Sequence, residues 1–135
     1  MIASLAGFIY WNWSPAKVFM GDCGSTFLGA LFFGLVIKQS NPINSLELLI
    51  IASPLLLDAS SCLTFRLYSG QNIFKPHKQH LYQRLHQYGW SHQKVACLYC
   101  FSCFLISLGL ITGGVKIASL LSFLTLIIGL MINNK

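Results

Sequence analysis

Acidic residues are almost absent from this sequence. Its 135 residues include only three carboxylates, Asp22, Glu47 and Asp58, and charged residues make up 9% of the chain, against about 25% in an average soluble domain. Apolar residues make up 55%, and the mean hydropathy is +0.65. This composition excludes an ordinary soluble domain and favours a membrane protein.

Positive charge outweighs negative charge, but much of it lies in one segment. The formal net charge is +6. Five of the nine basic residues fall in one polar stretch: Arg66, Lys75, Lys78, Arg84 and Lys94. A nucleic-acid binder carries its basic residues on a solvated face, and this chain has little such face, so we expect no nucleic-acid partner. The pattern instead predicts that the stretch is a cytoplasmic loop.

The cysteines do not form the pattern of a disulfide framework or a metal site. Cys62, Cys97, Cys100 and Cys103 all lie in apolar segments, where small polarizable side chains pack. The last three repeat every three residues along one helical face. A zinc site there would need thiolates in hydrocarbon without basic neighbours, so we do not expect one.

Apolar stretches divide the chain into membrane segments. A bilayer core needs about 20 apolar residues as a helix, so residues 1–13 predict only part of a span, which ends in aromatic residues typical of a membrane interface. Four full spans are predicted at about 23–38, 46–66, 95–112 and 115–132. The predicted fold is an all-α, polytopic transmembrane bundle: four full spans plus a truncated first one, and a cytoplasmic loop, 67–94, carrying a short amphipathic helix.

The orientation of the spans follows from the basic loop. If residues 67–94 are cytoplasmic, alternation of the spans places residues 15–25 on the same membrane face. Gly113-Gly114 predicts a tight helical hairpin between the last two spans. The short first stretch looks like a span that has been cut, which predicts that an upstream portion is missing.

The motif Phe19-Met20-Gly21-Asp22-Cys23-Gly24-Ser25 stands directly before a span. Gly21 and Gly24 allow the backbone to approach a ligand closely, and a helix start offers unpaired N–H groups to phosphate. Asp22 is a candidate Mg²⁺ ligand, since Mg²⁺ binds one or two carboxylates plus substrate phosphates. The alternative is that Asp22 is an ordinary N-cap at a membrane edge.

Asp58 lies well inside the predicted span 46–66. An aspartate near a helix centre costs about 2.5–3.5 kcal/mol on insertion scales, and such residues face a bundle interior or a wet cavity. Pro54 removes one backbone hydrogen bond and can kink the helix. Arg66 lies roughly 12 Å further along a helix, too far for direct pairing. Asp58 therefore either lines a site or is bonded to a neighbouring helix.

The polar loop contains a candidate substrate-binding helix. If residues 77–88 are helical, His77, His80 and Arg84 share one face through i,i+3 and i,i+4 spacing. Imidazoles and a guanidinium on one face suit a diphosphate. A zinc site is a poor alternative because no cysteine or carboxylate lies nearby. The stronger alternative is a basic helix held at the membrane surface by anionic lipid.

Taken in order, these three features resemble the polyprenyl-phosphate N-acetylhexosamine-1-phosphate transferases of glycosyltransferase family 4. They are the motif at 19–25, the Pro54-to-Asp58 segment and the histidine-containing loop. The resemblance covers essentially the whole chain, but only the C-terminal part of that family's architecture. It implies a multi-pass protein of the bacterial inner membrane.

The resemblance implies a Mg²⁺-dependent transfer of an N-acetylhexosamine-1-phosphate from a UDP-amino sugar to undecaprenyl phosphate, with release of UMP. Asp22 would be the catalytic and metal residue, and Asp58 would line the site. The substrate-binding residues would be Gly21, Gly24, Ser25, His77, His80 and Arg84. Tyr82-Gln83, where many members have a histidine pair, favours enzymes that initiate surface polysaccharides of the O-antigen or lipopolysaccharide type.

One departure from the family bears on activity. The family's paired-aspartate motif and its nucleotide motif lie upstream of what this sequence matches, and no two carboxylates are adjacent here. We therefore expect the chain alone to be incomplete as an enzyme. It could be half of a split transferase, supplied by an upstream half-protein or assembled as a homo-oligomer. The rival hypothesis is a non-catalytic membrane adaptor or lipid-binding fragment.

Overall fold

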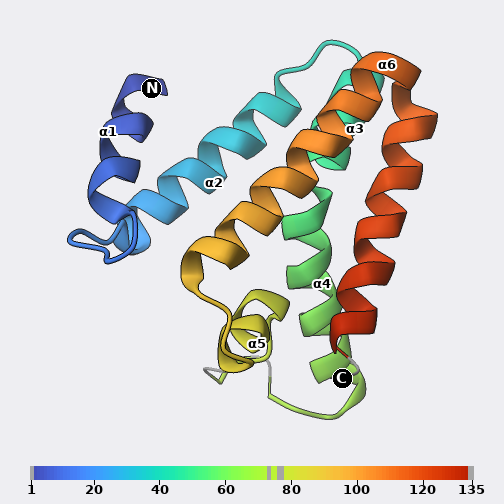
Figure 1. The fold of residues 1–135 in the computed structure, drawn as a ribbon. Coiled ribbons are helices and arrows are strands. Elements are labelled where there is room, and N and C mark those ends of the chain that lie inside the picture. Colours follow the sequence, from blue (N-terminus) through green and yellow to red (C-terminus); the bar gives the residue numbers. More distant parts are fainter. Residues whose placement is uncertain (1, 73, 76–77, 134–135) are drawn as a thin grey trace. The chain divides into compact units, whose positions relative to one another are not determined.

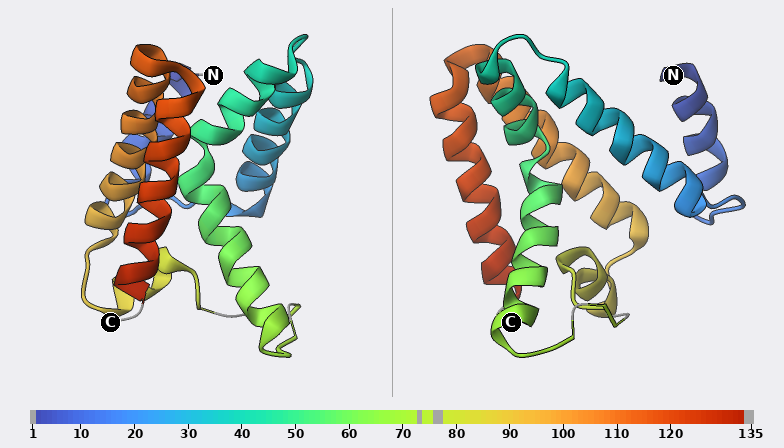
Figure 2. Two further views of the ribbon diagram at one scale, coloured as in Figure 1. Left: turned by 90° about the vertical axis from the view of Figure 1, so that its right-hand side faces the viewer. Right: turned by 180° about the vertical axis from the view of Figure 1, so that it is seen from behind.

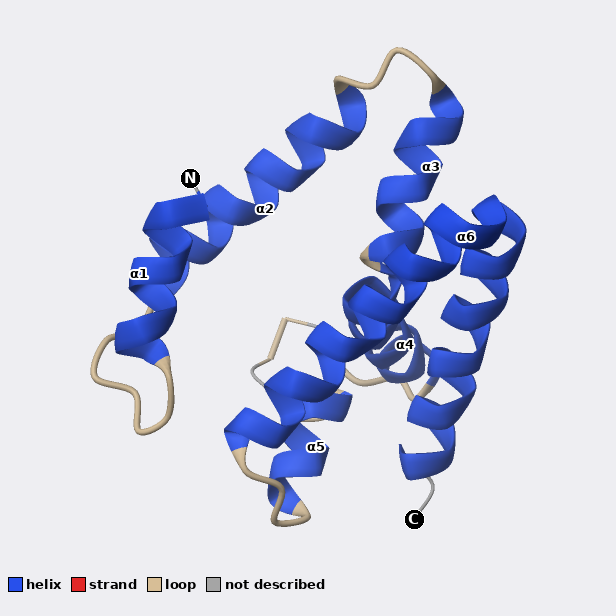
Figure 3. Ribbon diagram, turned by 45° about the horizontal axis from the view of Figure 1, so that its top comes forward, coloured by secondary structure: helices blue, strands red, loops and turns tan. Residues whose placement is uncertain are grey.

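The computed structural model describes residues 2–72, 74–75 and 78–133, and every regular element among them is a helix (Figures 1 and 3). The helices are α1 (Ile2–Asn12), α2 (Gly21–Ile37), α3 (Pro42–Ile51), α4 (Ser53–Tyr68), α5 (Leu81–Gln87) and α6 (His92–Asn133). The predicted all-α class is thus confirmed for the described residues. The chain divides into two compact units, Met1–Ser45 and Leu46–Lys135, which are described separately.

In the first unit, the segment before α2 folds back on the end of α1. The backbone N–H groups of Lys17 and Val18 donate to the carbonyl of Trp11 at 3.0 and 3.3 Å, and the amide of Asn12 donates to the carbonyl of Val18 at 2.8 Å. The Lys17 ammonium lies 5.6 Å from the centre of the Trp11 ring. These contacts fix the chain directly ahead of the Gly21-Asp22 start of α2.

The single span predicted over residues 46–66 is wrong in one respect, because the segment is broken. Helices α3 and α4 meet at Ala52 and are bent by 75°. Pro54 is the cause: it lacks an N–H and its ring clashes with the carbonyl four residues earlier, so it is tolerated only in the first turn of a new helix. The N–H groups of Leu55 and Leu56 instead bond to the Ala52 carbonyl.

Helix α6 is a hairpin of two limbs. Gly114 has φ 67° and ψ −165° inside it, at the predicted Gly113-Gly114, and separates two helical limbs. Figure 2 shows α6 doubling back on itself. The limbs approach closely: Ile106 and Ala118 are fully buried, and a Cβ on Gly109 would lie 2.5 Å from Cδ1 of Leu121. Small residues permit such close helix contacts in membranes.

The second limb of α6 also contacts the break between α3 and α4. The buried hydroxyls of Ser122 and Ser53 share a 2.6 Å hydrogen bond. This bond satisfies both hydroxyls away from water, where an unpaired polar group is costly. It joins the broken segment to the hairpin.

The length and hydropathy of the described helices test part of the prediction of membrane spans. By length and composition, the stretch His92–Gly129, which includes both limbs of the α6 hairpin, qualifies as a membrane segment, and the bent pair α3 and α4 qualifies if it counts as one span. Large apolar side chains on α6 are exposed, as expected for a lipid-facing surface: Phe104, Ile111 and Phe123. These features agree with a helical membrane protein, and four full spans stay a prediction.

The predicted helix over residues 77–88 is shorter in the structure. Helix α5 begins at Leu81 and ends at Gln87. Gly89 has φ 88° and ends the helix in a Schellman motif, in which Trp90 N–H bonds to the Leu85 carbonyl at 3.1 Å. Leu85 is only 1% exposed, so α5 rests on the bundle by its apolar side.

Replacing Gly114 by alanine should destabilise the α6 hairpin by about 1–3 kcal/mol, because its φ and ψ fall in a region essentially reserved for glycine. The measurement is the free energy of unfolding in detergent, followed by circular dichroism. Gly34→Ala is the control: its new Cβ meets nothing within 4 Å, and alanine in a helix interior should stabilise by roughly 0.5–1 kcal/mol. Equal effects of the two substitutions would contradict the assignment of the turn.

Candidate functional site

A cavity of about 670 Å³ lies in the second unit among α4, α5 and α6. Apolar side chains from α4 and both limbs of α6 make up much of its wall. They include Leu57, Phe65, Leu98, Phe101, Leu105 and Leu126. Such a volume and lining are typical of a site for a small molecule or for part of a lipid.

Two basic side chains stand at this cavity. Lys78 belongs to the polar loop and is exposed, whereas Arg84 belongs to α5 and is half-buried. Asp58 is the one carboxylate among the lining residues, so the lining carries a net positive charge. An apolar wall beside two cations suits an amphiphilic anion, because the guanidinium can bond two oxygens of a phosphate at once.

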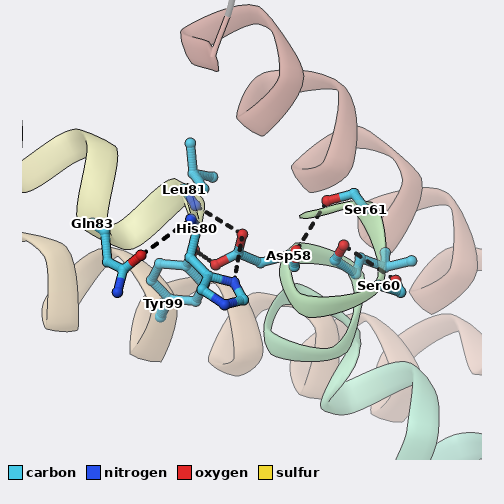
Figure 4. A network of polar contacts seen from close by, with 8 residues as sticks. Asp58, Ser60, Ser61, His80, Leu81, Gln83 and Tyr99 are labelled. Carbon is cyan, nitrogen blue, oxygen red and sulfur yellow. Dashed lines mark hydrogen bonds and ion pairs between the residues drawn. The ribbon is translucent and has the colours of Figure 1, made fainter. Parts of the chain in front are cut away.

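Asp58 is bonded to two neighbouring elements (Figure 4). Its Oδ1 accepts a 2.8 Å hydrogen bond from the backbone N–H of Leu81, and its Oδ2 accepts a 2.9 Å bond from the hydroxyl of Tyr99. The Nδ1 atom of His80 lies 3.9 Å from Oδ1, and the Asp58 side chain is 8% exposed. Asp58 is thus bonded to neighbouring helices and also stands at the cavity, and its part in a functional site stays a prediction.

Arg66 holds the beginning of the polar loop. Arg66 as a whole is 4% exposed, and its guanidinium donates from Nη2 to the backbone carbonyls of Asn72 and Lys75. Helix α4 ends just before, in a second Schellman motif: Gly70 has φ 64°, and Gln71 N–H bonds to the Arg66 carbonyl at 2.9 Å. One arginine thus bonds to two carbonyls of the loop, of which the Asn72 carbonyl also accepts the Lys75 N–H at 3.3 Å.

The predicted face shared by His80 and Arg84 does not form. His80 is the N-cap of α5 with extended backbone (φ −61°, ψ 147°), so its side chain is not in helical register with Arg84. Its N–H bonds to Oε1 of Gln83 at 3.3 Å, and its ring stacks on Tyr82 with centres 5.4 Å apart. His77, the third predicted residue of this face, lies outside the described residues.

The first unit carries the other predicted residues. Asp22 is exposed and lies in the first turn of α2, while Met20 is the N-cap and makes no side-chain capping bond. The alternative that Asp22 itself caps the helix is therefore wrong. Gly21 has φ 65°, and a Cβ on Gly24 would lie 2.4 Å from Cγ of Met20, so both glycines meet local backbone and packing requirements.

The surroundings of Asp22 fit a cation only in part. Ser25 bonds to the backbone carbonyl of Asp22 at 3.1 Å, which leaves the exposed carboxylate available. Among the described residues no group of three or more His, Cys, Asp or Glu gathers at one place. One free carboxylate is compatible with Mg²⁺, which takes its remaining ligands from phosphates and water.

Sequence reasoning missed Lys78 and Tyr99 as site residues. In the sequence, Lys78 stands out only as one of several basic residues in the polar loop. Tyr99 lies in an apolar span, and the signal that could have identified it is its hydroxyl, which needs a partner when it is buried. Asp58 was the available acceptor, but it is 41 residues away along the chain.

Comparisons with known proteins identify relatives of this chain. Residues 1–40 match the family model of glycosyl transferase family 4. A probable undecaprenyl-phosphate N-acetylglucosaminyl 1-phosphate transferase of Bacillus subtilis is 36% identical over 97 residues, 69% of this chain and 27% of the relative. A decaprenyl-phosphate N-acetylglucosaminephosphotransferase of Mycobacterium leprae is 31% identical over 73% of this chain and 28% of its own length.

A third relative has a different printed activity. The phospho-N-acetylmuramoyl-pentapeptide-transferase of Staphylococcus saprophyticus is 36% identical over 117 residues, 84% of this chain and 33% of the relative. The chain thus spans about a quarter to a third of the length of these curated relatives. No solved structure matches significantly. These matches assign the chain to glycosyl transferase family 4, as a partial-length relative of its polyprenyl-phosphate sugar-1-phosphate transferases.

Proposed function

We propose that the chain is the acceptor-lipid part of a transferase that moves an N-acetylhexosamine-1-phosphate from a UDP-sugar to undecaprenyl phosphate in the bacterial inner membrane. The observation that carries this proposal is the cavity of about 670 Å³ with an apolar wall, Lys78 and Arg84. A prenyl phosphate has the same division into a hydrocarbon chain and an anionic head. The names of two relatives, which specify undecaprenyl and decaprenyl phosphate, support the assignment.

In the proposed reaction, an oxygen of the prenyl phosphate attacks the β-phosphorus of the UDP-sugar. A new P–O bond forms, the bond between the β-phosphorus and the bridging oxygen breaks, and UMP leaves with that oxygen. Lys78 and Arg84 would hold the attacking phosphate by charge-assisted hydrogen bonds. Asp22 would hold Mg²⁺, which, when bound, offsets the negative charge of the transferring phosphates. Gly21, Gly24 and Ser25 would lie beside the diphosphate.

Acidic residues outside this sequence would complete the proposed metal site. The sequence has no adjacent carboxylates, and the described residues gather no cluster of metal ligands. We therefore propose that carboxylates outside these 135 residues complete the site, whether on the same polypeptide or on a partner chain. The product would be a lipid-linked sugar that initiates a surface polysaccharide of the O-antigen type, as the Tyr82-Gln83 variant of the loop suggests.

A second candidate function follows from the same two observations. A chain with a lipid cavity and without clustered carboxylates could bind prenyl phosphate as a membrane adaptor without turnover. A UMP-release assay separates the two functions. We expect no turnover from the purified chain alone, and EDTA-sensitive turnover once the upstream half is added. Lipid binding without turnover under both conditions would favour the adaptor.

Removing either cavity cation should weaken lipid binding. Lys78→Ala and Arg84→Ala should each lower the affinity for undecaprenyl phosphate by about 10-fold, since a hydrogen bond to a charged group contributes roughly 1.5–3 kcal/mol and Lys78 is exposed to solvent. The measurement is binding of undecaprenyl phosphate to the chain in nanodiscs. Lys94→Ala is the matched control, because Lys94 carries the same charge but does not line the cavity. An equal loss of affinity in Lys94→Ala would show that the effect comes from the overall positive charge and not from the cavity, and would contradict the prediction.

Replacing Asp22 by asparagine should abolish metal-dependent turnover in the assembled enzyme. The change keeps the shape of the side chain and removes its charge, so we expect a loss of about 100-fold or more in kcat. The assay is UMP release at increasing Mg²⁺ concentration, with Glu47→Gln as the control for loss of one acid. Undiminished activity of Asp22→Asn would eliminate the proposed metal role.

A further inference from the structure

We infer that Asp58 is a positioning residue, whose carboxylate fixes the start of α5 and so keeps Lys78 and Arg84 at the cavity. The inference rests on the proposed lipid-binding function of that cavity. Both carboxylate oxygens of Asp58 already accept hydrogen bonds, and a free anion beside a phosphate would repel it. Asp58 therefore acts through the elements it holds and not by contact with the lipid.

The first step of the argument is the start of α5. Leu81 is the first residue of α5, and the leading N–H groups of any helix lack partners within the helix. The Gln83 and Arg84 N–H groups bond to the His80 carbonyl at 3.0 Å. The Leu81 N–H instead bonds to Asp58, 23 residues earlier on α4. A side chain of another helix thus completes the start of this one.

The second step is the short length of α5. Its seven residues are fewer than the roughly 12–15 that an isolated helix needs to be even marginally stable in water. Its formation therefore depends on tertiary contacts. In the structure these are the buried side chain of Leu85, the packing of Leu81 near Gly129, and the bond from Leu81 to Asp58.

The third step is the position of the two cations. Arg84 lies about one helical turn after Leu81, and Lys78 lies three residues before Leu81 in the non-helical chain that leads into α5. Gln87 also bonds to the Lys78 carbonyl at 3.5 Å, which links the loop to the end of α5. If the start of α5 opens, both cations lose the backbone that directs them to the cavity.

The fourth step is Tyr99, which prevents Asp58 from turning away. Its hydroxyl bonds to the second carboxylate oxygen at 2.9 Å, and its ring also lines the cavity. Figure 4 shows the carboxylate between Leu81 on one side and Tyr99 on the other. Helix α6 therefore fixes the orientation of the Asp58 side chain, and Asp58 in turn fixes the position of the first residue of α5.

The test combines hydrogen exchange with lipid binding, on the full chain in nanodiscs with undecaprenyl phosphate as the probe. In Asp58→Ala, amides 81–87 should exchange at least about 10-fold faster, and affinity for the lipid should fall by about 10-fold, as expected for a lost bond to a charged group. Asp58→Asn keeps an acceptor for the Leu81 N–H, so it should restore most of the amide protection and most of the affinity for undecaprenyl phosphate. Tyr99→Phe should also speed exchange of amides 81–87 and lower the affinity for undecaprenyl phosphate, but by less than Asp58→Ala. If Asp58→Ala does not fold, Tyr99→Phe serves as the test variant.

Ser60→Ala is the matched control, because the Ser60 hydroxyl lies on the same helix and bonds only to the Leu57 carbonyl at 3.2 Å. It should change neither readout. Unchanged exchange in Asp58→Ala, or faster exchange with unchanged affinity, would overturn the positioning role while leaving lipid binding intact. A wild-type chain that does not bind undecaprenyl phosphate would instead overturn the proposed function, and the positioning role with it.

Discussion

The carboxylate of Asp58 joins three helices of the second unit at one buried point. An aspartate in the middle of a membrane helix costs about 2.5–3.5 kcal/mol, and each hydrogen bond to a charged group contributes roughly 1.5–3 kcal/mol. The two bonds from Leu81 and Tyr99 are therefore sufficient to offset the cost. Because the donors belong to α5 and α6, the charge is stabilised only when these helices are assembled around α4.

Helix α4 holds the polar loop at both of its ends. Arg66 at the end of the helix donates to the carbonyls of Asn72 and Lys75, and Asp58, two turns earlier, accepts from the amide of Leu81. The cation bonds to carbonyls and the anion to an amide, so each charge meets the backbone dipole of the opposite sign. Helix α4 is thus bonded to the described residues at both ends of the polar loop.

Sequence patterns predicted the features that depend on neighbouring residues. The hydropathy pattern predicted the all-α class, and the adjacent Gly113 and Gly114 predicted the reversal of the chain within α6. Hydropathy could not locate the break at Ala52, because the residues on either side are apolar, although Pro54 did indicate a kink. The spacing of His80 and Arg84 suggested one helical face, but the extended backbone of His80 is set by its role as the N-cap of α5. The role of Tyr99 could not be predicted, because its hydrogen-bond partner Asp58 is 41 residues away in the sequence.

Two of the three carboxylates, Asp22 and Asp58, differ in how far their oxygens are available to a ligand. A cation ligand needs accessible lone pairs, and both oxygens of Asp58 are committed inside the bundle. Giving one of them to Mg²⁺ would take the acceptor from the Leu81 or Tyr99 donor, both of which are part-buried, at a cost of roughly 1–3 kcal/mol for a donor left unpaired. Asp22 is exposed, in the first turn of α2, and has no such commitment. Of these two acids, Asp22 is therefore the one that can serve the proposed metal, and Asp58 the one that maintains the fold of the cavity.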